Sequence, residues 1–246
     1  MRRLLFICSA VILCTTSAYA QKTKPWTEWS EKDAEKVLND SAWGQTQTEG
    51  GGTQTGDSST SAFTATTLAR REDSSTSAAA KVESGEKRES PSVHFRVRLM
   101  SAKPIRAAFV RMIELQGAPA EKVAQLRPFV DRDFADYVVV TITMDGNDRK
   151  VMGPVVQELK NGDPAVLKTT TYLERKDGKR VALMDYRPPI EDGLGAKFVF
   201  PRTLDGKPFL DASSGEVRFA TELGKALKIN RRFKISEMMY DGKLEY

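Results

Sequence analysis

The stretch TTTYLERKDGKRVALMDY, residues 169–186, carries the clearest local structural signal of this 246-residue chain. Two strand-like runs flank the dipeptide Asp177-Gly178, which fits a two-residue turn that needs positive φ angles. Tight turns of this kind join antiparallel neighbours. The stretch therefore predicts a β-hairpin within a sheet that is at least partly antiparallel.

Further strands are predicted on both sides of this hairpin. In residues 93–99 apolar side chains alternate with polar ones, which is typical of a strand with one dry and one wet face. Residues 136–144, DYVVVTITM, form a continuous apolar and β-branched run that favours a central strand. AKFVF (196–200) and EVRFATE (216–222) also fit strands, and Asp241-Gly242 predicts a second tight turn.

Helical periodicity is concentrated between residues 101 and 160. Residues 101–117 place apolar side chains on one side of a helix that Gly117 is expected to end. A shorter helix is predicted over residues 120–126, before Pro128, and a third over residues 154–160, with Pro154 in its first turn. Together these patterns predict a single α+β domain over residues 91–246, with an antiparallel or mixed sheet of roughly six to eight strands and two or three helices.

The N-terminus predicts a secretory signal peptide over residues 1–20. Met1-Arg2-Arg3 supplies the positive region, residues 4–13 the apolar region, and Ala18-Tyr19-Ala20 the cleavage site before Gln21. A membrane anchor would need about 20 apolar residues, and this run is shorter. Lipid attachment at Cys14 is a second alternative, although Leu13 stands where that processing favours a small residue. We expect an exported protein, periplasmic or extracellular, whose mature chain has no membrane span.

Cleavage changes the composition on which functional inferences rest. Both cysteines, Cys8 and Cys14, fall in the signal peptide, so the mature chain has no disulfide, thiol nucleophile or thiolate metal site. Removing Arg2 and Arg3 from 38 Lys and Arg leaves 36, against 33 Asp and Glu, for a net charge of +3. Nucleic acid is not an expected partner. Anionic polymers or lipids of the envelope stay open as partners.

Residues 45–90 predict a disordered linker. They are rich in Gly, Ser, Thr and Gln and contain almost no large apolar residues. Such a stretch cannot bury enough surface to offset the entropy lost on ordering it. The linker is expected to separate the folded domain from an N-terminal segment over residues 21–44.

That N-terminal segment contains all three tryptophans, in KPWTEWSEKDAEKVLNDSAWG, residues 24–44. Ser30 followed by Asp33 resembles a helix N-cap, and a helix is predicted over residues 31–39. A nine-residue helix is marginal alone in water, so the segment should be docked on something. Trp26, Trp29 and Trp43 are the predicted contact residues. Docking on its own domain is one hypothesis, and recognition of another envelope protein is the other.

Few residues indicate catalysis, and no catalytic residue, metal site or cofactor is predicted. His94 is the only histidine, and Arg96 and Arg98 should share its strand face, which is typical of a solvated surface. Glu191 and Asp192 lie in YRPPIEDGLGAKF, a Pro- and Gly-rich loop, and could serve a metal-independent hydrolase. The simpler interpretation is that the loop is structural. No phosphate-loop, dinucleotide or calcium-loop spacing occurs.

Basic residues cluster at two places in the second half of the chain. Arg231, Arg232 and Lys234 alternate with apolar residues, while four basic residues surround the hairpin turn, at positions 175, 176, 179 and 180. The default interpretation is protection of exposed sheet edges against mispairing. A patch for an acidic ligand is the alternative.

Three motifs resemble a group of exported bacterial proteins of unknown function. They are the frame W-x-x-W-S-x-x-D-A-E-K-x-L-x-D-S-x-W-G over residues 26–44, AKFVFPR over residues 196–202, and the closing MMYDGKLEY. The resemblance implies bacterial export and a recurrent domain layout, but no catalytic residue, cofactor or substrate. The sequence as a whole predicts an exported, non-enzymatic interaction or structural module, with the hydrolase at Glu191 and Asp192 as the alternative.

Overall fold

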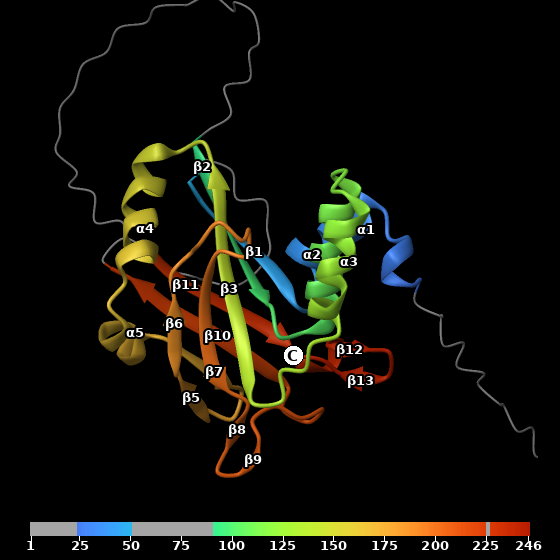
Figure 1. Cartoon of the computed structure of the whole chain (residues 1–246). Coiled ribbons are helices and arrows are strands. Elements are labelled where there is room, and N and C mark those ends of the chain that lie inside the picture. The colour runs from blue at the N-terminus through green and yellow to red at the C-terminus, as the bar shows by residue number, and fades with distance from the viewer. Residues whose placement is uncertain (1–23, 51–90, 225–226) are drawn as a thin grey trace, which may run out of the picture.

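The computed structural model describes residues 24–50, 91–224 and 227–246 (Figure 1). The predicted signal peptide, and the predicted linker from residue 51 onward, lie outside these described residues. The fold is α+β, as predicted, and every strand pair that the described residues form is antiparallel.

The described strands form two main sheets instead of the single sheet that was expected. The first sheet has the order β1 (Gly44–Gly50), β2 (Ser92–Leu99), β3 (Tyr137–Gly146), β7 (Ala196–Pro201), β6 (Asp185–Arg187). The second sheet has the order β11 (Leu227–Lys234), β10 (Glu216–Leu223), β4 (Tyr172–Arg175), β5 (Arg180–Ala182). Two small hairpins pair β8 (Thr203–Leu204) with β9 (Lys207–Pro208) and β12 (Met239–Tyr240) with β13 (Lys243–Leu244).

The chain changes sheets directly after the β4–β5 hairpin, whose turn contains Asp177-Gly178. The Leu183 N–H donates to the carbonyl of Thr171, beside the second sheet, and the Met184 N–H donates to Val199 in the first sheet. Local patterns identified these strands but carried no information on which partner each would take. In the described residues from 91 onward, the two main sheets contain eight strands, within the expected six to eight, and the two small hairpins add four more. The expectation of a single sheet was wrong.

The main core lies between the two sheets. Alternate residues of β2, namely Val93, Phe95 and Val97, are fully buried, as the predicted period of two requires. Phe219 of the second sheet packs edge-on against Phe198 and Phe200 of the first, with ring centroids 5.6 and 6.1 Å apart. Burying each such ring contributes about 1.5–3 kcal/mol, so this contact fixes the sheets against each other.

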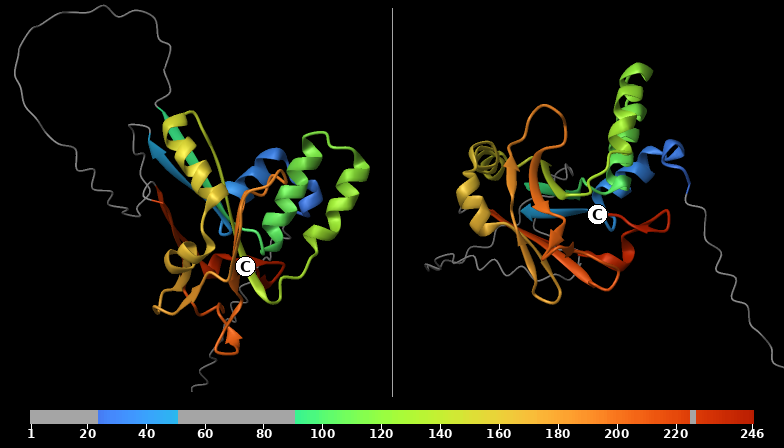
Figure 2. Two further views of the ribbon diagram at one scale, coloured as in Figure 1. Left: turned by 60° about the vertical axis from the view of Figure 1, so that its left-hand side comes forward. Right: turned by 60° about the horizontal axis from the view of Figure 1, so that its bottom comes forward.

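Two groups of helices lie on opposite sides of the sheets (Figures 1 and 2). On one side are α4 (Arg149–Asn161) and α5 (Pro164–Thr170), whose Val155 and Leu167 enter the main core. On the other side α1 (Glu31–Asn39), α2 (Lys103–Leu115) and α3 (Ala120–Val130) enclose a second apolar cluster. The described part of the domain from residue 91 onward thus has four α-helices, where two or three were expected.

Two predicted helix boundaries at prolines are wrong. Helix α3 continues past Pro128 to Val130, and α4 begins at Arg149, before Pro154. A proline inside a helix removes the hydrogen bond to the carbonyl four residues earlier. Those carbonyls belong to Ala124 and Lys150, two exposed residues, so water can solvate them and the helices continue.

Both predicted tight turns are present, but only the one at Asp241-Gly242 has the predicted two-residue form. Asp241 and Gly242 both have positive φ, 48° and 75°, as the predicted two-residue turn requires. At the first hairpin only Gly178 is positive, at 83°, and the Arg175 N–H donates to the Lys179 carbonyl around a three-residue loop. The hairpin is therefore confirmed with a longer turn than expected.

The predicted linker begins too early, because residues 44–50 form strand β1. This strand pairs with β2 along its whole length, from Gly44 opposite Arg98 to Gly50 opposite Ser92. Its Gln and Thr side chains gave no apolar alternation, so composition assigned the strand to the linker. Residues 51–91 consequently connect Gly50 and Ser92, two directly paired residues of one antiparallel hairpin, a position that is usually filled by two to five residues.

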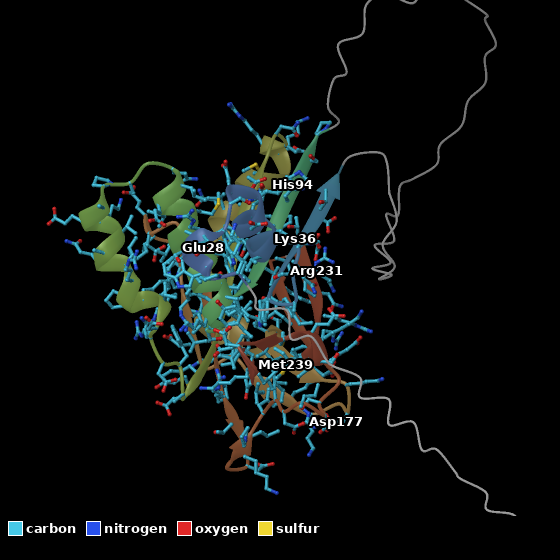
Figure 3. All side chains as sticks on the ribbon, turned by 90° about the vertical axis from the view of Figure 1, so that its right-hand side faces the viewer. Glu28, Lys36, His94, Asp177, Arg231 and Met239 are labelled. Carbon is cyan, nitrogen blue, oxygen red and sulfur yellow. The ribbon has the colours of Figure 1, made fainter. Side chains whose placement is uncertain are left out.

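Polar side chains also join β1 to the edge of the second sheet. Gln45 and Gln47 donate through Nε2 to the carbonyls of Arg232 and Lys228 in β11, over 2.6 and 3.0 Å. In return Arg231 donates to the Thr46 carbonyl, over 2.7 Å (Figure 3). Glutamine amides carry the same donor and acceptor as a peptide group, so these side chains replace a β-ladder between β1 and β11.

No helix in the described ranges has the length and apolar character needed to cross a bilayer.

Candidate functional site

The helix of the tryptophan segment forms where its capping residues predict it. Helix α1 covers Glu31–Asn39, and Ser30 accepts from the Asp33 N–H over 3.2 Å. The Asp33 carboxylate accepts in turn from the Ser30 N–H over 2.9 Å, which completes a capping box. Hydrogen bonds from the backbone and side chain of Ser30 lower the pKa of Asp33. The inward face of α1 buries Ala34 and Leu38.

Trp29 is the anchor of this segment on the helical layer. Its side chain is only 9% exposed and belongs to the apolar cluster of α1, α2 and α3. Its indole N–H donates to the Lys24 carbonyl over 2.9 Å, and its own carbonyl accepts from Arg111 of α2 over 2.7 Å. Trp26 is half-buried beside it, with the Arg127 guanidinium 5.7 Å from its ring centroid.

Trp43 joins the segment to the end of the described chain. Its indole N–H donates to the Glu245 carbonyl over 2.8 Å, and its ring meets Tyr240 edge-on at 6.3 Å. The Glu245 carboxylate accepts from the Lys103 N–H over 3.1 Å, at the first turn of α2. An anion at a helix N-terminus is stabilising, so Glu245 connects Trp43 to α2. Burial raises the pKa of Tyr240 to about 12.

Arg98 binds the C-terminal end of α1. The sequence predicted that Arg98 lies on a solvated strand face, and the structure corrects this prediction. Its side chain is 6% exposed and donates to the Leu38 carbonyl over 3.0 Å and to Asn39 Oδ1 over 2.8 Å. Burial lowers the pKa of Arg98 to about 10. Gly44 permits this close approach, because a Cβ there would lie 2.2 Å from the Leu38 carbonyl oxygen. The strand alternation was read correctly, but α1 covers part of the face that was expected to be solvated.

The three predicted contact residues thus lie against their own domain. This is the first of the two docking hypotheses. Recognition of an envelope protein by these indoles stays an untested prediction, and the surface available for it is the exposed part of Trp26 and Trp43.

The candidate hydrolase residues do not converge on a cavity. Asp192 forms an ion pair with Lys197 over 2.7 Å and accepts from the Leu194 N–H over 2.9 Å, while Glu191 is exposed. Asp185 pairs with Arg187 over 3.1 Å. None of these carboxylates lines either of the two cavities described below. His94 contacts Thr48 Oγ1 through Nδ1 over 2.9 Å, at the β1–β2 pairing.

The outer face of the second sheet brings together basic residues that are far apart in sequence. Arg218 lies directly opposite both Arg232 and Glu174, and Glu174 lies opposite Arg180. We call these four side chains, one from each strand, the arginine row. Adjacent strands are about 4.8 Å apart, so the row spans about 14 Å.

Part of the arginine row is held in place by carboxylate and aromatic contacts. Glu174 forms ion pairs with Arg180, over 2.5 Å, and with Arg218. Burial acts to raise the pKa of Glu174, but hydrogen bonds from Arg180 and Arg218 outweigh it and lower the pKa. The two guanidiniums also lie 4.4 and 5.5 Å from the Tyr172 ring centroid. Within the described part of the chain, the Arg232 guanidinium has neither an ion pair nor a hydrogen bond.

A cavity of about 360 Å³ borders this row. Its lining has four cationic residues and two carboxylates: Glu174, Arg175, Lys176, Gly178, Glu216, Arg218 and Arg232. Because Asp177, outside the lining, neutralises Arg175, the uncompensated excess is one positive charge. Arg175 is held by the Phe209 carbonyl over 3.0 Å and by Asp177 over 2.9 Å, yet its Nε has no partner. The cavity is polar and positively charged, which favours a small anionic group over an apolar ligand.

A second cavity of about 210 Å³ lies near the start of α2. Arg106 lines it but is fully engaged with main-chain carbonyls, among them those of Val130 and Arg132. Burial lowers the pKa of Arg106 to about 10. Lys103 is paired with Asp131 over 2.8 Å. Lys103, Arg106 and Arg202 of this cavity therefore have partners supplied by the protein, and the Arg132 guanidinium lies over the Phe134 ring at 5.3 Å.

Sequence reasoning found half of the arginine row. It singled out Arg180 and Arg232 as members of basic clusters but missed Arg218 and Glu174. In EVRFATE, Arg218 lies between the apolar Val217 and Phe219. Because successive side chains of a strand point to opposite faces, the sequence alone could have shown that Arg218 points away from the core. Only the register of four strands shows that these side chains are neighbours.

No protein-family model, curated protein or solved structure significantly matches this chain. The resemblance to exported bacterial proteins therefore stays a prediction from the motifs, and the functional inference rests on the geometry alone.

Proposed function

We propose that this protein is an exported, non-enzymatic interaction module whose tryptophan segment serves its own fold rather than a partner. The observation that carries the proposal is the engagement of the indoles: Trp29 is buried, and Trp29 and Trp43 both donate their N–H groups to main-chain carbonyls. An indole that is already buried and hydrogen-bonded has little apolar area left to offer. Recognition is then left to a surface elsewhere on the domain.

The arrangement of the acids also supports a non-enzymatic role. Asp192 is neutralised by Lys197, and both Asp192 and the exposed Glu191 lie outside the two cavities. Acid–base hydrolysis of glycosides needs two carboxyl groups that flank one substrate bond. No observation favours the hydrolase, so we do not propose it as a second function.

Affinity capture from envelope extract tests the role of the tryptophans. The wild-type chain and Trp26→Ala are compared, because Trp26 is half-buried and its loss leaves Trp29 and Trp43 in place. We expect both baits to capture the same proteins. A partner that is lost with Trp26→Ala, while the variant stays folded by circular dichroism, would show that the segment is a recognition peptide.

Screening against glycoside and ester libraries tests the non-enzymatic part. We expect no turnover by the wild-type chain. Turnover that disappears in both Glu191→Gln and Asp192→Asn would overturn the proposal in favour of a hydrolase.

A further inference from the structure

Two arginines of the arginine row are held in place by protein contacts, and the third, Arg232, has no ion pair among the described residues. Glu174 satisfies Arg180 and Arg218, and both guanidiniums contact the Tyr172 ring, so both are held in place without a ligand. Arg232 stands directly opposite Arg218 and has no partner within the described residues. Fixing charges in advance lowers the cost of binding, because less side-chain entropy is lost when the ligand arrives.

We propose that the cavity beside Arg218 and Arg232 binds a phosphate group. This inference deepens the proposed function and rests on it, because it names the ligand class of the recognition surface. Apart from Arg175, which Asp177 neutralises, the cavity lining has three cations and two carboxylates, and a phosphate monoester carries a charge of about −1.5 to −2 at neutral pH. Arginine forks match the oxygens of phosphate and donate to them in pairs.

The Glu216 carboxylate contributes a negative charge that opposes anion binding at this site. It lines the same cavity, on the strand that carries Arg218, and repels any anion bound there. The site therefore predicts opposite effects for two neutral substitutions. Removing a cation weakens phosphate binding, and removing the Glu216 carboxylate strengthens it. A surface that merely protects a sheet edge would show neither effect.

The test is a titration of the ¹⁵N-labelled mature chain, with the amide shift of Gly178, which lines the cavity, as readout. The probes are inorganic phosphate and acetate at matched ionic strength, and vesicles of phosphatidylglycerol and phosphatidylcholine by co-sedimentation. The variants are Arg232→Gln and Glu216→Gln, with Lys122→Gln on exposed α3 as a control of equal charge change. Matching thermal unfolding of all four proteins shows that the fold is intact.

We expect phosphate to bind more tightly than acetate, with affinity reduced about tenfold by Arg232→Gln, increased by Glu216→Gln and unchanged by Lys122→Gln. Binding of inorganic phosphate alone identifies a soluble phosphate as the source, and binding of phosphatidylglycerol vesicles alone identifies a lipid headgroup; both support the proposal. Equal binding of acetate, equal effects of Arg232→Gln and Lys122→Gln, or no binding of any probe would overturn it. The capture experiment with Trp26→Ala is independent of this face, so failure here leaves the proposed function standing.

Discussion

The tryptophan segment and the arginine row differ in whether their polar side chains have partners within the protein. Around α1, three strong donors meet protein acceptors: Trp29 and Trp43 donate to carbonyls, and Arg98 donates to the end of the helix. On the second sheet Arg232 is exposed and has no partner among the described residues. Hydrogen bonds that are completed within the protein stabilise its fold. A charged side chain without a protein partner, such as Arg232 on the second sheet, is available to bind a ligand. The following predictions test this contrast, from the largest expected effect to the smallest.

Trp29→Ala should cause the largest loss of stability. It removes a buried indole from the cluster of α1, α2 and α3, which costs about 3–5 kcal/mol for a fully buried tryptophan. Urea unfolding followed by circular dichroism measures the change. The matched control is Trp26→Ala, whose half-buried ring should cost about 1 kcal/mol. Equal losses for the two variants would contradict the account.

Arg98→Met tests whether hydrogen bonding, and not only apolar burial, holds α1 in place. Methionine keeps most of the side-chain volume but leaves the Leu38 carbonyl and the Asn39 side chain without their donor. Leaving buried acceptors unsatisfied should cost about 2–3 kcal/mol in the same unfolding measurement. Arg96→Met, which affects the more exposed ion pair with Asp145, should cost less than 1 kcal/mol. The reverse order would contradict the assignment.

Replacing residues 51–91 with a four-residue turn that contains Asn-Gly should leave the fold intact. Gly50 and Ser92 are directly opposite in β1 and β2, so the pairing does not need the long connection. Shortening a closed loop by about tenfold lowers the entropy cost of closing it by about 2 kcal/mol. The free energy of unfolding, measured in urea, should therefore increase by about 2 kcal/mol. A variant that fails to fold would show that residues 51–91 contribute contacts of their own.

Acid should weaken the arginine row by a small and specific amount. The pKa of Glu174 is lowered in the folded state, so its stabilisation is present above the ordinary value of 4.5 and is lost as the pH falls through the folded value. The stability difference between the wild type and Glu174→Gln should therefore shrink as the pH falls below 4.5. A difference that is constant with pH would show that the ionised carboxylate does not stabilise the row.

The parts of the fold that depend on local patterns were predictable from the sequence. Ser30 and Asp33 marked the start of α1, and the alternation of residues 93–99 marked β2 with its buried face. Asp241-Gly242 fixed the last turn, because both of its residues need positive φ. In each case the determining contacts lie within a few residues of one another.

The parts that depend on distant partners were not predictable. Strand β1 is polar, and its order comes from β2 and from the glutamine bonds to β11, which local composition does not reveal. Helices α3 and α4 continue through prolines, and the residues whose carbonyls lose a donor there, Ala124 and Lys150, are exposed. The arginine row needs the register of four strands, so only its individual members could be noticed.

The central claim is that the tryptophan segment is an integral part of the folded domain, and indole hydrogen exchange tests it most directly. In the ¹⁵N-labelled mature chain, the indole N–H groups of Trp29 and Trp43 should exchange far more slowly than those of an isolated peptide of residues 24–44, and that of Trp26 should be intermediate. Exchange of all three at the rate of the isolated peptide would contradict the account.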